Sequence, residues 1–119
     1  MDDDYLEAVL GVVELIPSGR VMTYGTVAEV VAEVLVATGG HARGGPRQVG
    51  RVMALAGGGV AWWRVVNAAG RSTDRLAARA LDHWLVEGTP LTADSERIVL
   101  RRAIWFPHED AALSAPSAR

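Results

Sequence analysis

Residues 16–25 read Ile-Pro-Ser-Gly-Arg-Val-Met-Thr-Tyr-Gly and lie between two segments of helical periodicity. Apolar residues recur at helical spacing through residues 5–16, and Asp4 can cap this first helix at its N-terminus. The Pro-Ser-Gly sequence then ends the helix. Thr23 is a good N-cap for a second helix over residues 24–37. The sequence therefore predicts two helices joined by a short extended connection.

A third, basic helix is predicted over residues 46–56. It follows a glycine-rich loop at residues 39–45, and Pro46 suits the first turn of a helix. Arg47 and Arg51 are four residues apart, so they share one face. Two helices, a glycine-containing loop and a basic third helix resemble a helix-turn-helix, which binds DNA. The alternative is that these arginines only solvate a helix surface.

The rest of the chain contains apolar segments and one further helix. Residues 60–67 are apolar and β-branched enough for a strand or a buried loop. A final helix is expected over residues 75–87, with Gly88 as its C-cap. Residues 98–100 and 103–106 are expected to form a short hairpin or wing. These elements predict an α/β fold, mostly α, with a winged helix-turn-helix core.

The length of the chain limits the number of domains. At 119 residues it is long enough for one domain and too short for two separate cores. We assign the domain to residues 1–107. The tail at residues 108–119 is rich in alanine, serine and proline, and we expect it to be disordered.

Composition excludes several kinds of chemistry. The chain has no cysteine, which removes disulfides, thiolate metal sites and cysteine nucleophiles. Its three histidines, residues 41, 83 and 108, lie on separate segments without ligand spacing, so no metal site and no cofactor are expected. No apolar run of about 18 residues is present, and the N-terminus begins with aspartates rather than basic residues. We therefore expect a cytoplasmic protein without a membrane partner.

The charged residues are unevenly distributed. All twelve basic residues are arginine, and the net charge of the chain is −2. Residues 1–35 carry −6, whereas residues 36–81 hold seven arginines against one aspartate and carry +6. A basic middle third is a plausible surface for DNA phosphates.

Three motifs keep a distinctive order and spacing: residues 16–25, residues 47–50 (Arg-Gln-Val-Gly) and residues 62–67 (Trp-Trp-Arg-Val-Val-Asn). Together they resemble the DNA-binding domain of O6-alkylguanine-DNA alkyltransferases, over residues 5–107. The active centre of that family reads Pro-Cys-His-Arg-Val-Val. Here Trp62 stands at the cysteine position and Trp63 at the histidine position. A tryptophan in place of the cysteine is the hallmark of the alkyltransferase-like proteins, which this chain resembles.

The resemblance implies a function in DNA repair without catalysis. Alkyl transfer needs an activated thiolate, and this chain has none, so no enzyme activity is expected. Alkyltransferase-like proteins bind O6-alkylguanine in double-stranded DNA and flip the lesion into the former active-site pocket. The bound lesion is then handed to nucleotide excision repair proteins. The resemblance thus implies a DNA-damage sensor, which we expect to be a monomer.

The resemblance also implies which residues contact DNA. Arg47 would fill the space left by the flipped base, where a guanidinium can stack and form hydrogen bonds. Tyr24 would help to rotate the nucleotide. The expected DNA-contacting residues are Tyr24, Arg47, Gln48, Gly50 and Arg51. The alternatives are a solvated helix arginine at position 47 and a packed tyrosine at position 24.

A second set of residues is expected to form the lesion pocket. Trp62 would offer apolar surface to the alkyl group and a stacking face to the base. Arg75 would lie against the flipped base as a cation–π partner. Trp63 either lines the pocket or fills the core in place of the histidine. The full set is Tyr24, Trp62, Trp63, Val65 and Arg75.

Two other functions fit the same sequence. A winged-helix regulator would read a DNA sequence with the basic helix and would not need a lesion. A decayed domain would act only as a protein partner, and its basic region would then confer no affinity for DNA.

Overall fold

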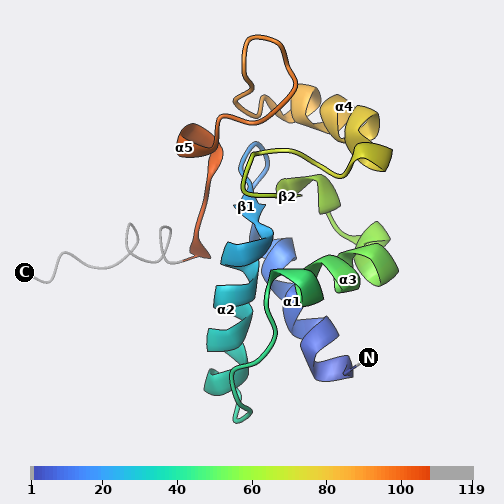
Figure 1. Cartoon of the computed structure of the whole chain (residues 1–119). Helices are drawn as coiled ribbons and strands as arrows, with labels where there is room; N and C mark the ends of the chain where they lie inside the picture. The colour runs from blue at the N-terminus through green and yellow to red at the C-terminus, as the bar shows by residue number, and fades with distance from the viewer. Residues whose placement is uncertain (1, 108–119) are drawn as a thin grey trace, which may run out of the picture.

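The structure is a computed structural model that describes residues 2–107 (Figure 1). The disorder predicted for residues 108–119 lies outside the described residues. The α-helices are α1 (Asp3–Leu15), α2 (Tyr24–Ala37), α3 (Pro46–Ala56), α4 (Ala77–Glu87) and α5 (Leu100–Ala103). Three 3-10 turns, η1 (Gly57–Gly59), η2 (Trp62–Arg64) and η3 (Asp74–Leu76), and two strands, β1 (Met22–Thr23) and β2 (Val65–Val66), complete these elements. The mostly helical fold with a small sheet confirms the predicted class.

Helices α1, α2 and α3 pack around one apolar core. Each contributes valines with no exposed surface, and these include Val9, Val13, Val27, Val31, Val49 and Val52. Burying one such side chain contributes roughly 1.5–3 kcal/mol to folding. This core holds α3 in place with its basic face outward.

Helix ends show why these segments are helical. Thr23 caps α2 as predicted, because its hydroxyl accepts a hydrogen bond from the Thr26 N–H at 3.1 Å. Gly88 ends α4 with a φ of +70°, a conformation that favours glycine. The prediction that Asp4 caps α1 was wrong. Asp2 is the cap, since its carboxylate accepts from the backbone N–H groups of Asp4 and Tyr5.

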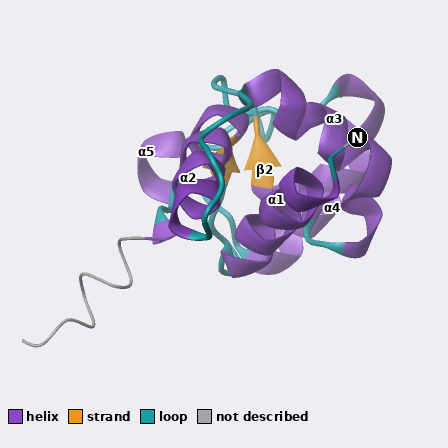
Figure 2. Ribbon diagram, turned by 90° about the horizontal axis from the view of Figure 1, so that it is seen from below, coloured by secondary structure: helices purple, strands orange, loops and turns teal. Residues whose placement is uncertain are grey.

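A short parallel sheet joins this core to the second half of the fold. Met22 pairs with Val65 and Thr23 pairs with Val66. Figure 2 shows the strands lying among the helices. Beyond the sheet, α4 contributes Ala80 and Trp84 to a second apolar cluster. The other buried members of this cluster are Val21, Val66, Ile98 and Ala103. The predicted last helix begins later than expected, because residues 74–76 form the 3-10 turn η3 that leads into α4.

The hairpin predicted from residues 98–100 and 103–106 was wrong. Helix α5 occupies the middle of that stretch. Its flanks bridge to other segments: Ile98 to Leu91 and Ile104 to Val21. One helical turn keeps Arg101 and Arg102 exposed while Ala103 is buried. Among the described residues, no helix is long and apolar enough to span a membrane.

Candidate nucleic-acid interface

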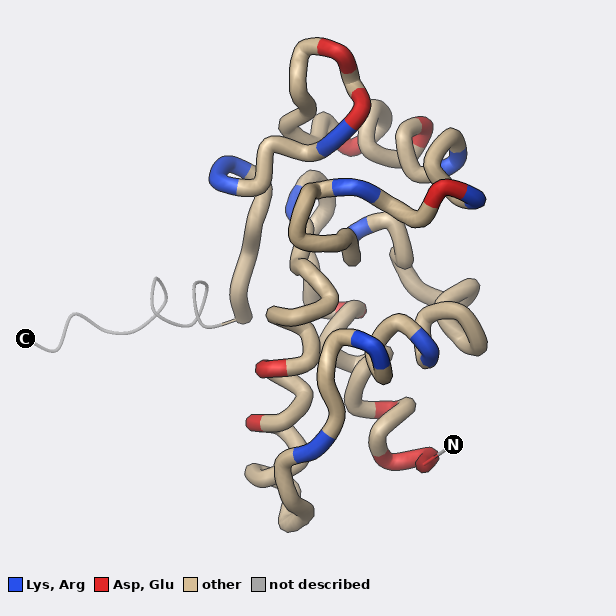
Figure 3. Tube along the Cα trace, viewed as in Figure 1, with Lys and Arg blue, Asp and Glu red and all other residues tan. Residues whose placement is uncertain are grey.

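The exposed face of α3 carries the predicted basic residues. Figure 3 shows arginines on α3 and on the loop before it, while acidic residues lie on α1 and α2. Arg47 and Arg51 are both exposed. Gln48 is exposed as well, and its Oε1 accepts the Gly45 N–H at 2.9 Å, which closes the N-terminus of α3. The helix therefore presents two guanidinium groups to solvent from a fixed backbone.

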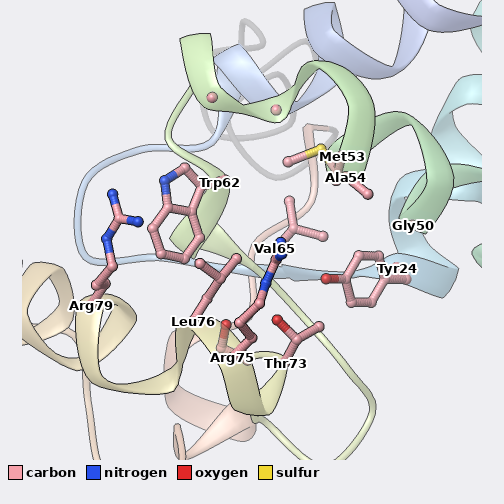
Figure 4. A pocket seen from close by; sticks show the side chains of 13 residues that line it. Tyr24, Gly50, Met53, Ala54, Trp62, Val65, Thr73, Arg75, Leu76 and Arg79 are labelled. Atoms are coloured by element: carbon pink, nitrogen blue, oxygen red, sulfur yellow. The ribbon is translucent and has the colours of Figure 1, made fainter.

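A cavity of about 390 Å³ opens between α3, η2 and the η3–α4 segment (Figure 4). That volume lies at the lower end of the range for small-molecule sites. Five of the predicted site residues line it: Tyr24, Gly50, Trp62, Val65 and Arg75. The structure thus brings together residues from four separate segments of the chain.

Tyr24 and Gly50 form the side of the cavity nearest α3. Figure 4 shows the Tyr24 hydroxyl pointing into the cavity toward Thr73. Burial raises the pKa of the Tyr24 hydroxyl, so it stays protonated and can donate a hydrogen bond at neutral pH. A side chain at Gly50 would meet open space, so the α3 backbone is accessible at this point.

Trp62, the first residue of the turn η2, forms the wall of the cavity opposite Tyr24. Its ring meets two other rings edge-on: the Trp63 ring at 5.6 Å and the His83 ring at 5.8 Å between centroids. Edge-to-face contacts of this kind are favourable for aromatic rings. They fix the orientation of the indole, whose other side lines the cavity.

Trp63 does not line the cavity, which corrects the prediction that placed it in the pocket. Its indole N–H donates to the Glu87 Oε2 at 2.8 Å. Its ring stacks on the His83 ring at 3.6 Å between centroids, with an angle of 5° between the planes. The physical reason is the partly buried carboxylate of Glu87, which draws the indole N–H away from the cavity. Trp63 therefore packs behind Trp62.

Glu87 is the centre of a hydrogen-bond network beneath the cavity wall. Its Oε1 accepts the Gly19 N–H at 2.9 Å, and its Oε2 lies 2.6 Å from a guanidinium nitrogen of Arg64. Arg64 also donates to the Ile16 carbonyl at 2.9 Å. Burial acts to raise the pKa of Glu87, but the hydrogen bonds from Arg64, Gly19 and Trp63 outweigh it and lower that pKa. The carboxylate is therefore ionised at neutral pH and joins α4 to the end of α1.

Arg51 and Gln48 do not line this cavity. They line a second cavity, of about 470 Å³, between α3 and the start of α1. Arg43 contributes to the same cavity, and its Nε donates to the Asp2 carboxylate at 3.0 Å. This ion pair fixes the loop before α3 against α1. Arg47 lines neither of these two cavities.

Sequence reasoning did not assign several residues that line the first cavity, among them Met53, Thr73, Leu76 and Arg79. A signal was present for two of them. Met53 follows Gly50 by three positions, and Arg79 follows Arg75 by four, so helical spacing places each on the face of its assigned neighbour. Within residues 2–107, no group of three or more His, Asp or Glu side chains is arranged to hold a metal ion.

Comparisons with known proteins agree with this geometry. Residues 4–88 match the family described as 6-O-methylguanine DNA methyltransferase, DNA binding domain. The structure is similar to S. pombe Atl1 in complex with damaged DNA containing O6-carboxymethylguanine, with a TM-score of 0.67 and 30% identity. It is also similar to S. pombe ATL in complex with DNA, with a TM-score of 0.66 and 28% identity. Each comparison covers 90% of this chain and 99% of the other. A search of curated proteins gave no significant match.

The three-helix core, the basic α3 and the adjoining cavity define a small helical domain of the nucleic-acid-binding class. The chain belongs to the family of the 6-O-methylguanine DNA methyltransferase DNA-binding domain, and its fold is that of the alkyltransferase-like protein Atl1.

Proposed function

We propose that this protein is a non-catalytic sensor of O6-alkylguanine in double-stranded DNA. The observation that carries the proposal is the cavity between α3 and α4, which opens beside the exposed arginines of α3. DNA that lies along α3 would have a base-sized space within reach of one extruded nucleotide. Enzymes and sensors that handle a single base inside a duplex commonly extrude it in this way.

The cavity suits an extruded alkylguanine. The Trp62 ring offers a stacking face, and Val65, Met53 and Leu76 offer apolar surface for the alkyl group. Arg75 can lie over the purine as a cation–π partner. Arg47, in the first turn of α3, would fill the space that the base leaves in the duplex. The exposed guanidinium groups of Arg47 and Arg51 would make binding weaker as salt increases.

The proposal includes no alkyl transfer. The chain has no cysteine, and the Glu87 carboxylate accepts hydrogen bonds from Gly19, Trp63 and Arg64 instead of orienting a catalytic base. A protein that binds a lesion without removing it needs a second system to complete repair. We therefore propose that the bound complex, formed by a monomer in the cytoplasm, marks the lesion for nucleotide excision repair.

Incubation of the protein with a duplex containing O6-methylguanine should leave both molecules chemically unchanged. The masses of the protein and of the recovered strand, measured by mass spectrometry after hours at 37 °C, should equal those of the starting materials. A bound fraction recovered on native gels in the same samples provides the control for engagement. A protein mass increased by one methyl group, or a strand that has lost it, would contradict the non-catalytic part of the proposal.

A further inference from the structure

The cavity between α3 and α4, where we propose that the lesion binds, is here called the lesion cavity. It is lined by a second arginine in addition to Arg75. Arg79 lines the same cavity from the first turn of α4. Figure 4 shows Arg79 on the Trp62 side of the cavity and Arg75 extending toward Val65. The two arginines therefore reach the cavity from different directions.

No acidic side chain of residues 2–107 lines the cavity beside these two arginines. Within the part of the chain that the structure describes, Arg75 and Arg79 form no ion pair with a carboxylate. Of the acids nearest in sequence, Asp74 lines a different cavity, together with Arg71 and Ala77. Asp82 is exposed on α4, and among the described residues it forms no ion pair with Arg79.

Arg79 lies where the helix dipole disfavours a positive charge. The N-terminus of α4 carries a partial positive charge, which disfavours a cation in the first turn. Leu76, the cap residue of α4, makes no side-chain cap hydrogen bond there. A cation that opposes a local rule at the edge of a cavity is a candidate for a functional residue. Arg79 is exposed, so its guanidinium is accessible to an anion that enters the cavity.

We propose that Arg79 selects O6 substituents that carry a negative charge, in particular a carboxylate, over neutral substituents of the same shape. This inference rests on the proposed function, because it concerns the alkyl group of a base bound in this cavity. A guanidinium can hold a carboxylate through two parallel hydrogen bonds, which a neutral amide cannot match. Phosphates of the DNA backbone are the same in every duplex, so they cannot produce this selection.

The test compares two lesions that differ only in charge. Duplexes of one sequence carry O6-carboxymethylguanine, its neutral analogue O6-carbamoylmethylguanine, or guanine, and dissociation constants are measured by fluorescence anisotropy at low and moderate salt. We expect the protein to bind the carboxymethyl duplex about tenfold more tightly than the carbamoylmethyl duplex at low salt. Arg79→Gln should reduce this ratio to near one. Arg101→Gln, which removes an exposed arginine on α5, should leave the ratio unchanged.

The outcomes separate this inference from the proposed function. If the protein binds both lesion duplexes more tightly than the guanine duplex, but with equal affinity for the two lesions, the inference is overturned and the sensor function stands. If Arg79→Gln weakens all three duplexes by the same factor, Arg79 is a phosphate contact and the inference is also overturned. If neither lesion binds more tightly than guanine, the proposed function itself fails.

Discussion

Replacement of Glu87 by glutamine is expected to lower the free energy of unfolding by about 2–4 kcal/mol at pH 7. The side chains of Glu87 and Arg64 are only 10% and 20% exposed, so the variant leaves a guanidinium with little access to water. The N–H groups of Gly19 and Trp63 also lose a charged acceptor. Urea denaturation followed by circular dichroism measures the effect. Because Trp63 packs behind Trp62, the same change should loosen the cavity wall.

Glu29→Gln provides the matched control for this experiment. Glu29 is exposed on α2, and its replacement should change stability by less than about 0.5 kcal/mol. The pH dependence gives a second check. The pKa of Glu87 is lowered from its ordinary value of 4.5 in the folded state, so its stabilisation is complete above that pH. It is lost as the pH falls through the lowered pKa, and the wild type and Glu87→Gln should then converge. Equal stability of the two proteins at pH 7 would refute the structural role of Glu87.

Arg47→Ala should remove most of the preference for a lesion. Unstacking a base costs a few kcal/mol. Without the Arg47 guanidinium, nothing fills the space that the extruded base leaves in the duplex, so no contact there offsets this cost. We expect affinity for an O6-methylguanine duplex to fall by about tenfold to a hundredfold, with a smaller effect on an unmodified duplex. Both dissociation constants are measured by fluorescence anisotropy at one fixed salt concentration.

Arg51→Ala is the matched control, because Arg51 lies one turn further along the same helix and does not line the lesion cavity. Its removal should weaken binding to lesion and unmodified duplexes by a similar factor, as expected for a phosphate contact. If both variants reduce binding to the two duplexes equally, Arg47 contributes only electrostatic attraction and has no role in extrusion.

Much of the fold could be predicted from local sequence signals. The bounds of α2 and α3 agree with the prediction, because Thr23 and Pro46 fix where those helices start. The side-chain oxygen of Asn67 accepts the N–H groups of Ala69 and Arg71 and so fastens the turn that follows it. These features depend on neighbours within a few residues, and sequence patterns report such neighbours directly.

The errors have a common physical origin in contacts between distant segments. The assignment of Trp63 to the pocket was wrong, because a long-range hydrogen bond to Glu87 holds its indole behind Trp62. The stretch around α5 looked like a hairpin, but its flanks bridge to Leu91 and Val21 instead of to each other. Arg79 was missed although it lies four residues after Arg75, because only the folded chain shows that the cavity extends from η3 onto α4.

The central claim is that this protein discriminates alkylated from unmodified guanine in duplex DNA. The most direct measurement is the ratio of its dissociation constants for two duplexes that differ by one O6-methyl group, at moderate salt. We predict a ratio of about ten or more in favour of the lesion. Equal binding to both duplexes would contradict lesion sensing and indicate a reader of DNA sequence, and the absence of binding at low and moderate salt would leave only a protein partner.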